Sequence, residues 1–226
     1  MADITLYMAP GTCARVASIA LEEAGLEFET RVVRFMKGEH KSPTYTKLNP
    51  KGKVPTLFVD GETLTENVAI VTWLNERFPE ARLMPPATST LERARQLADL
   101  CFCASTLHPL VTRIRMPHFF ATEDVARAVW EKGCASMTDY FDLIEHRLEH
   151  RSWWYRESWS AMDAYLYWVF WRVAGADFDV SPYPRYSDHA SRMERRPSVV
   201  RALAREAEAQ KQLEAEGLAF TPLKLE

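Results

Sequence analysis

Cysteine, threonine and proline residues in the first third of the chain occur in patterns that suit thiol chemistry. Pro10-Gly11-Thr12-Cys13 follows an apolar run and leads into a helical pattern. A cysteine at the start of a helix lies beside unpaired backbone N–H groups and the positive end of the helix dipole, which lower the pKa of a thiol. Cys13 is therefore a candidate nucleophile, and the Thr12 hydroxyl is a candidate hydrogen-bond donor to the thiolate of a bound thiol. A small buried cysteine beside an ordinary helix cap has the same pattern.

Two further segments could hold a peptide-like ligand. Residues 49–57 contain Val54-Pro55, and X-Pro is the linkage at which a cis bond costs least. A cis bond there would let the Val54 backbone pair with an extended peptide as an added strand, whereas a plain edge-strand proline is the alternative. Glu66-Asn67 opens a helical pattern, where backbone N–H groups and a carboxylate suit the two charges of an amino acid group. An ordinary helix start is again the alternative.

The elements that must position these segments alternate between strand and helix. Period-2 runs, helical spacing and turn residues predict strands at residues 4–8, 28–33, 56–59 and 62–64, with helices at residues 14–24 and 66–78. Gly25 suits the left-handed position after a helix, and the first strand–helix–strand unit should have parallel strands. Asp60-Gly61 favours a type I′ turn, so the last two strands should form an antiparallel hairpin.

The rest of the chain has helical spacing without a convincing strand. After a proline-bearing stretch, we expect helices at residues 90–112, 123–149, 159–174 and 197–214. Ser160 with Asp163 three residues later has the pattern of a helix capping box. The predicted architecture is an α/β domain at residues 1–83, a linker at residues 84–89 and an all-helical domain at residues 90–226.

Composition excludes several classes of function. The 226 residues carry 28 Lys+Arg and 31 Asp+Glu, a net charge of −3, which argues against a nucleic-acid-binding surface. The longest apolar run, residues 164–171, is too short to cross a membrane, and the N-terminus lacks the pattern of a secretory signal. Four scattered cysteines do not form a disulfide framework, so we expect a reduced, cytoplasmic protein.

Two patterns resemble metal motifs but predict no metal site. His146-Arg147-Leu148-Glu149-His150 matches H-x-x-E-H. Its helix should bury the apolar positions, which leaves both histidines on the solvent side. Cys101 and Cys103 are two residues apart on a predicted helix and so point to different faces.

The motifs, taken in order, resemble those of the soluble glutathione S-transferases over essentially the whole chain. These motifs are P-G-T-C, then L-N-P-x-G-x-V-P-T-L at residues 48–57, L-T-E-N-x-A-I at residues 64–70, and W-S-A-M-D-A-Y at residues 159–165. P-G-T-C is most similar to the P-G-A-C of bacterial beta-type members, which use the cysteine. The resemblance implies a thioredoxin-like domain with a mixed four-stranded sheet, a helical-bundle domain, glutathione as co-substrate, and a homodimer.

The resemblance also implies roles for residues of the first domain. Val54 would be the main-chain partner of the cysteinyl part of glutathione, with Pro55 as the cis-proline. Glu66 and Asn67 would bind the γ-glutamyl end, although most relatives carry serine in place of Asn67. His40 and Lys53 match positions that commonly meet the glycyl carboxylate. For the group that activates the thiol, the order of preference is Cys13, then Thr12, then Tyr7.

The second substrate would lie against the helical half. His108 resembles a histidine that approaches the cysteine in beta-type members, although Pro109 stands where those relatives often carry lysine; an interhelical histidine is the alternative. Aromatic residues such as Phe119 suit an aromatic substrate, and Arg113 could meet a polar tail. The predicted function is transfer of the glutathione thiolate to a small hydrophobic electrophile, as in detoxification. Isomerisation, ether cleavage, dehalogenation, thiol–disulfide exchange and a non-catalytic interaction protein are the alternatives.

Overall fold

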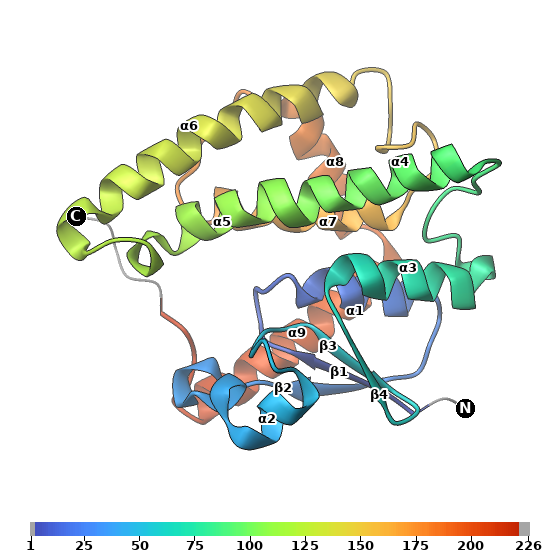
Figure 1. The fold of residues 1–226 in the computed structure, drawn as a ribbon. Coiled ribbons are helices and arrows are strands. Elements are labelled where there is room, and N and C mark those ends of the chain that lie inside the picture. The colour runs from blue at the N-terminus through green and yellow to red at the C-terminus, as the bar shows by residue number, and fades with distance from the viewer. Residues whose placement is uncertain (1–2, 222–226) are drawn as a thin grey trace. The chain divides into compact units, whose positions relative to one another are not determined.

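The computed structural model describes residues 3–221, which form two compact units (Figure 1). One unit comprises residues 3–83 with residues 195–220, and the other comprises residues 84–194. This division differs from the expected domains in one respect, because helix α9 (Pro197–Ala215) belongs to the first unit and not to the helical domain. The physical reason is that α9 packs along α1 (Ala14–Glu23), to which it is joined by the buried Arg15–Glu206 ion pair and by the partly exposed Glu22–Arg205 pair.

The first unit is built on a four-stranded mixed sheet with the strand order β2-β1-β3-β4. Its strands are β1 (Ile4–Met8), β2 (Glu29–Val32), β3 (Thr56–Val59) and β4 (Glu62–Thr65). Strand β1 runs parallel to β2 and antiparallel to β3, which forms the expected hairpin with β4. Asp60 and Gly61 have φ values of 48° and 92°, as a type I′ turn requires. The predicted strands and their directions are confirmed.

Helix α1 lies at the centre of the first unit. It packs against β1, against α3 (Asn67–Arg77) and against α9, and all but the last of its residues are buried. In Figure 1, α1 and α9 lie side by side over the sheet. The helix ends at Glu23, and Gly25 adopts a left-handed φ of 64° as expected. Burial on several sides fixes the position of the first turn of α1, which follows Cys13 directly.

A short helix that was not predicted from the sequence, α2 (Pro43–Leu48), follows β2 and two single 3₁₀ turns. The Ser42 hydroxyl accepts a hydrogen bond from the Tyr45 amide at 3.2 Å, and Pro43 occupies the first helical position. The helix buries Tyr45 beneath the loop that leads into β3.

The second unit is helical. Its helices are α4 (Thr90–Cys101), α5 (His108–Arg115), α6 (Glu123–Arg147), α7 (Ala161–Ala174) and α8 (Pro184–Glu194). A π-helical segment, Phe102–Leu107, joins α4 to α5, so that the two form one long rod beside α6 (Figure 1). The core gathers aromatic rings around Phe141, whose ring centroid lies 4.8 Å from that of Tyr186. In the part of the chain that the structure describes, no helix combines the length and the apolar character needed to span a membrane.

Candidate active site

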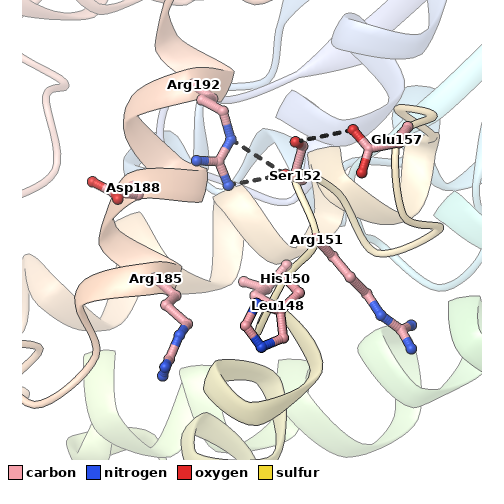
Figure 2. Close-up of a pocket in the computed structure, with 8 residues that line it drawn as sticks. All are labelled: Leu148, His150, Arg151, Ser152, Glu157, Arg185, Asp188 and Arg192. Atoms are coloured by element: carbon pink, nitrogen blue, oxygen red, sulfur yellow. Dashed lines mark hydrogen bonds between the residues drawn. The ribbon is translucent and has the colours of Figure 1, made fainter.

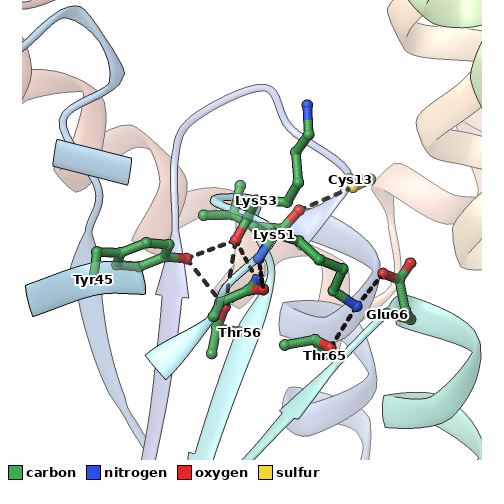
Figure 3. Close-up of polar contacts among 9 residues, drawn as sticks. Cys13, Tyr45, Lys51, Lys53, Thr56, Thr65 and Glu66 are labelled. Atoms are coloured by element: carbon green, nitrogen blue, oxygen red, sulfur yellow. Dashed lines mark hydrogen bonds and ion pairs between the residues drawn. The ribbon is translucent and has the colours of Figure 1, made fainter. Parts of the chain in front are cut away.

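Cys13 occupies the N-cap position of α1. Its side chain is buried, with 8% of the residue exposed, and Sγ donates a weak hydrogen bond to the Val54 carbonyl oxygen at 3.6 Å (Figure 3). The Val54–Pro55 peptide bond is cis, as expected from the sequence. The thiol therefore lies between the start of a helix and the backbone of the proline loop. A helix start stabilises an anion, so this is a position at which a thiolate is favoured.

Thr12 is engaged differently. Its hydroxyl donates a 2.6 Å hydrogen bond to the Ala9 carbonyl oxygen and lies 3.4 Å from the Ala14 amide as an acceptor. A hydroxyl has one proton to donate. That proton closes the turn between β1 and α1, so the Thr12 hydroxyl is already engaged as a donor.

Tyr7 lies on β1 and contacts a different part of the unit. Its ring packs edge-on against Tyr45, and its hydroxyl accepts a 3.4 Å hydrogen bond from Arg31. Tyr7 lines a polar cavity of about 360 Å³ between β2, the segment around α2, and α9. Cys13 does not line this cavity. Tyr7, the third candidate for thiol activation, therefore faces this cavity together with Tyr45.

A buried polar network fixes the backbone before the cis-proline. The carbonyl oxygen of Lys53 accepts hydrogen bonds from the Tyr45 hydroxyl at 2.7 Å and from the Asn49 amide at 2.8 Å. The Thr56 hydroxyl lies within hydrogen-bond distance of both donors (Figure 3). Burial raises the pKa of Tyr45, so its hydroxyl stays protonated and can donate. This network was not identified from the sequence, because its members are separated by turns whose geometry local patterns do not predict.

The segment with His40 lies against the segment with Lys53 because the residue before Lys53 is a glycine. Gly52 has a φ of 60°, and a Cβ atom added to it would lie 2.8 Å from the His40 carbonyl oxygen, so the two backbones approach as only glycine allows. The His40 ring stacks on Phe35 at 4.5 Å. Burial, followed by the charges of Lys41 and Lys53, lowers the pKa of His40. At neutral pH the imidazole is therefore uncharged, and the side chain of Lys53 beside it is exposed.

Glu66 and Asn67 stand at the start of α3 with distinct surroundings. The exposed Glu66 carboxylate pairs with Lys51 Nζ at 2.5 Å, and the residue has a φ of 73°. Asn67 is only 5% exposed, and its amide nitrogen donates to the Cys13 carbonyl oxygen at 2.9 Å. The Asn67 side chain thus holds the cysteine loop. The exposed Glu66 carboxylate lies against the Lys51 ammonium group (Figure 3). The first unit therefore brings Cys13, Val54, Pro55 and Asn67 together.

The residues predicted in the helical half lie on and after α5. His108 begins α5, where its Nδ1 is 3.1 Å from the Tyr165 hydroxyl and its ring meets that of Trp168 edge-on at 4.7 Å. The Arg113 guanidinium lies over the Phe120 ring. Phe119, the residue before Phe120, is 71% exposed. An aromatic surface and a cation thus adjoin each other at the end of α5.

The H-x-x-E-H segment lies elsewhere in the helical unit. Leu148 is buried, while His146 and His150 are exposed, as the helical pattern predicted. His150 lines a polar pocket of about 310 Å³ (Figure 2) in which Arg192 donates to the Ser152 carbonyl oxygen and Arg185 pairs with glutamates of α6 and its end. Among residues 3–221, no three His, Cys, Asp or Glu side chains gather as metal ligands would.

Together, the fold and the site define a class of protein. A thioredoxin-like unit with a cysteine at the start of α1, a cis-proline before β3 and an acidic residue at the start of α3 is combined with a helical unit. These features define a two-unit protein in which a thioredoxin-like unit is combined with a helical unit.

Comparison with known proteins gives the family. Residues 11–77 match the family model described as glutathione S-transferase, N-terminal domain. A beta-class glutathione S-transferase from Sphingomonas chungbukensis is 30% identical with a TM-score of 0.78, over 89% of this chain and 98% of that one. A sphingomonad glutathione S-transferase complexed with glutathione is 32% identical with a TM-score of 0.77, over 90% and 98% of the chains. Maleylacetoacetate isomerase maiA from Aspergillus fumigatus is 30% identical, over 88% of this chain and 89% of its own. The chain belongs to the soluble glutathione S-transferase family, with bacterial members among its relatives.

Proposed function

We propose that this chain binds glutathione in an extended form along Val54 and places the glutathione thiol beside Cys13. Membership of the family makes the chain a glutathione transferase with glutathione as its co-substrate. The observation that carries the placement is the 3.6 Å contact between Cys13 Sγ and the Val54 carbonyl oxygen. A peptide that pairs with the Val54 backbone brings its own cysteine to that point. The start of α1 then favours the thiolate form of the bound glutathione, and this thiolate is the nucleophile.

The two ends of glutathione would meet the groups on either side. The γ-glutamyl ammonium would pair with Glu66 in exchange for Lys51, and its carboxylate would accept from backbone N–H groups at the start of α3. The glycyl carboxylate would pair with Lys53 and accept a hydrogen bond from His40. Because the pKa of His40 is lowered, this histidine would act as a neutral donor, and Lys53 would supply the charge.

We propose that the electrophile is small, hydrophobic and aromatic, and that it contacts the helical unit near the end of α5. Phe119 offers an exposed aromatic ring there, and Arg113 offers a cation for a polar tail. His108 is held by Tyr165, which orients its ring. We also propose a cytoplasmic location, because four scattered cysteines in a chain of this length do not suit the disulfide framework of a secreted protein.

Glutathione-dependent isomerisation is a second candidate activity. It is favoured by the similarity to maleylacetoacetate isomerase maiA over most of both chains. The two reactions share the thiolate and differ in the step after it adds to the second substrate, because isomerisation releases glutathione again whereas conjugation retains it. Assaying maleylacetoacetate isomerisation beside conjugation of a chlorinated nitroaromatic, both with glutathione, separates the two candidates.

Titration calorimetry should detect binding of glutathione at submillimolar to millimolar concentration. Conjugation of the chlorinated nitroaromatic should be seen as a change in absorbance. Glu66→Gln should weaken glutathione binding by about tenfold, since a hydrogen bond to a charged group contributes about 1.5–3 kcal/mol. Glu62→Gln, which changes an exposed acid on β4, is the matched control and should bind as the unaltered chain does. Absence of binding at millimolar glutathione would refute the proposed site.

We propose that the chain forms a homodimer, as the resemblance to the soluble glutathione S-transferases implies, and that exposed positions of α4 contribute to the interface. Leu100 is the buried residue of this helix, whereas Leu91 and Leu97 are 58% and 47% exposed. Each of the two exposed leucines is an apolar position that a second subunit could cover, and their spacing of six residues places them about 120° apart around the helix. Sedimentation should give twice the chain mass, and Leu97→Glu should shift it toward the monomer. A monomeric mass for the unaltered chain would remove the proposal.

A further inference from the structure

The loop that carries Cys13 is held by an acid from the far end of the chain. Glu206 lies on α9 and is buried against α1. One of its carboxylate oxygens, Oε1, accepts from the Gly11 amide at 2.7 Å and from Arg15 Nη2 at 2.7 Å. The other, Oε2, accepts from Arg15 Nε at 2.9 Å. A single carboxylate thus fixes the chain two residues before Cys13 and two residues after it.

We propose that Glu206 is a positioning residue for the Cys13 thiol that acts through the Gly11 amide, with Arg15 orienting the carboxylate. The inference rests on the proposed function, in which Cys13 faces the thiol of glutathione. Gly11 has a left-handed φ of 72°, so its amide direction is specific to this turn. The forked hydrogen bonds of Arg15 fix the first turn of α1 in orientation as well as in distance. The Asn67 amide on α3 also donates a hydrogen bond to the Cys13 carbonyl oxygen. Side chains from α3 and from α9 therefore both hold the loop.

The role differs from that of the other ion pairs between α1 and α9. Glu22 is also buried and pairs with Arg201 and Arg205, both at 2.6 Å. Glu22 lies nine residues after Cys13, which is about 13 Å along a helix. Glu22 therefore joins the two helices without touching the cysteine loop. Glu206 joins the same helices and also reaches the Gly11 amide, which makes Glu22 the natural control.

A matched pair of double variants separates positioning from stability. Arg15→Met/Glu206→Gln removes the buried charges but keeps an amide oxygen that can accept from Gly11. Arg15→Met/Glu206→Met also removes the charges, but it leaves the Gly11 amide without this acceptor. Replacing a buried ion pair by apolar side chains of similar size is often neutral for stability. Both chains should therefore fold, and thermal unfolding checks this.

The measurement is made on Cys13 itself. Alkylation by iodoacetamide is followed between about pH 5 and 9 by mass analysis of the peptide that contains Cys13. Burial raises the pKa of Cys103 and brings that of Cys134 to about 11, so both should react slowly at neutral pH. The peptide readout also separates Cys13 from the exposed Cys101. Conjugation kinetics give kcat and the KM for glutathione in parallel.

Arg15→Met/Glu206→Met should have a kcat about tenfold or more below that of Arg15→Met/Glu206→Gln. The KM values of the two variants for glutathione should agree within about threefold. The pH midpoint of Cys13 alkylation in Arg15→Met/Glu206→Met should shift by about half a unit or more. Glu22→Ala should lower the unfolding temperature yet leave the alkylation profile and kcat unchanged. Equal alkylation profiles in the two double variants would overturn the role of Glu206. If the unaltered chain shows no glutathione conjugation, the proposed function fails, while the alkylation comparison still decides the positioning role.

Discussion

Cys13→Ala is expected to lower kcat/KM for glutathione conjugation by about 10- to 100-fold. The thiol lies at the start of α1, 3.6 Å from the Val54 carbonyl oxygen, where the thiolate of bound glutathione would be stabilised. A hydrogen bond to a charged partner contributes about 1.5–3 kcal/mol, and each 1.36 kcal/mol is a factor of ten in rate. Steady-state kinetics over a range of glutathione concentrations measure the loss and divide it between kcat and KM.

The same substitution at another cysteine is the control. Cys101→Ala changes an exposed thiol on α4 and should leave both kinetic constants as they are. Thr12→Ala should cause a smaller loss than Cys13→Ala, because the Thr12 hydroxyl donates to Ala9. An unchanged kcat in the Cys13 variant, with a large loss in the Thr12 variant, would reverse the assignment and make the hydroxyl the activating group.

The sheet, the start of α7 and the loop before Cys13 were predictable because their signals are local. The type I′ turn needs two left-handed residues, and Asp60-Gly61 shows this directly in the sequence. The capping pattern of Ser160 and Asp163 likewise predicted the start of α7 to within one residue. At Val54-Pro55 the residue type made a cis bond a candidate and left an edge-strand proline open, and the family resemblance favoured the cis bond that the structure shows. In each case the determining atoms lie within a few residues of one another.

The support of the Cys13 loop was not predictable, since it depends on distant contacts. A charged Arg15 in an apolar helix signals that a buried partner must exist. Its partner, Glu206, is 191 residues away, on a helix that was expected in the other domain. Spacing along α9 shows that the helix is amphipathic but not which helix it packs against.

Helix α8 was missed for a different reason. Its buried residues, Tyr186, His189, Ala190 and Met193, have the spacing of one helical face. The signal was therefore present, but the other residues of the helix are mainly polar and two of the four buried ones are a tyrosine and a histidine. Such a face is recognised as core only when the partner of the histidine is known, and that partner is Asp163 on α7.

Asp163→Ala is expected to lower the free energy of unfolding by about 3–5 kcal/mol, because it breaks a buried network around a charged group. The carboxylate has no exposed surface and accepts from the Trp154 amide at 2.8 Å and the Ser160 amide at 2.9 Å. His189, also without exposed surface, donates to it from Nε2 at 2.9 Å. Alanine would leave these donors buried without acceptors. Urea unfolding followed by tryptophan fluorescence measures the change.

Two variants show whether the loss comes from the buried acceptor. Asp163→Asn keeps one acceptor oxygen and should lose less than alanine does, because the Ser160 amide or the Trp154 amide can still be satisfied. Asp179→Ala removes an exposed carboxylate that accepts from the Ser181 amide, and its unfolding midpoint should stay close to that of the unaltered chain. A loss below about 1 kcal/mol for Asp163→Ala would mean that water replaces the carboxylate in the network. A large loss with unchanged kcat per folded molecule would instead show that the network supports the fold of the helical unit and not the chemistry at Cys13.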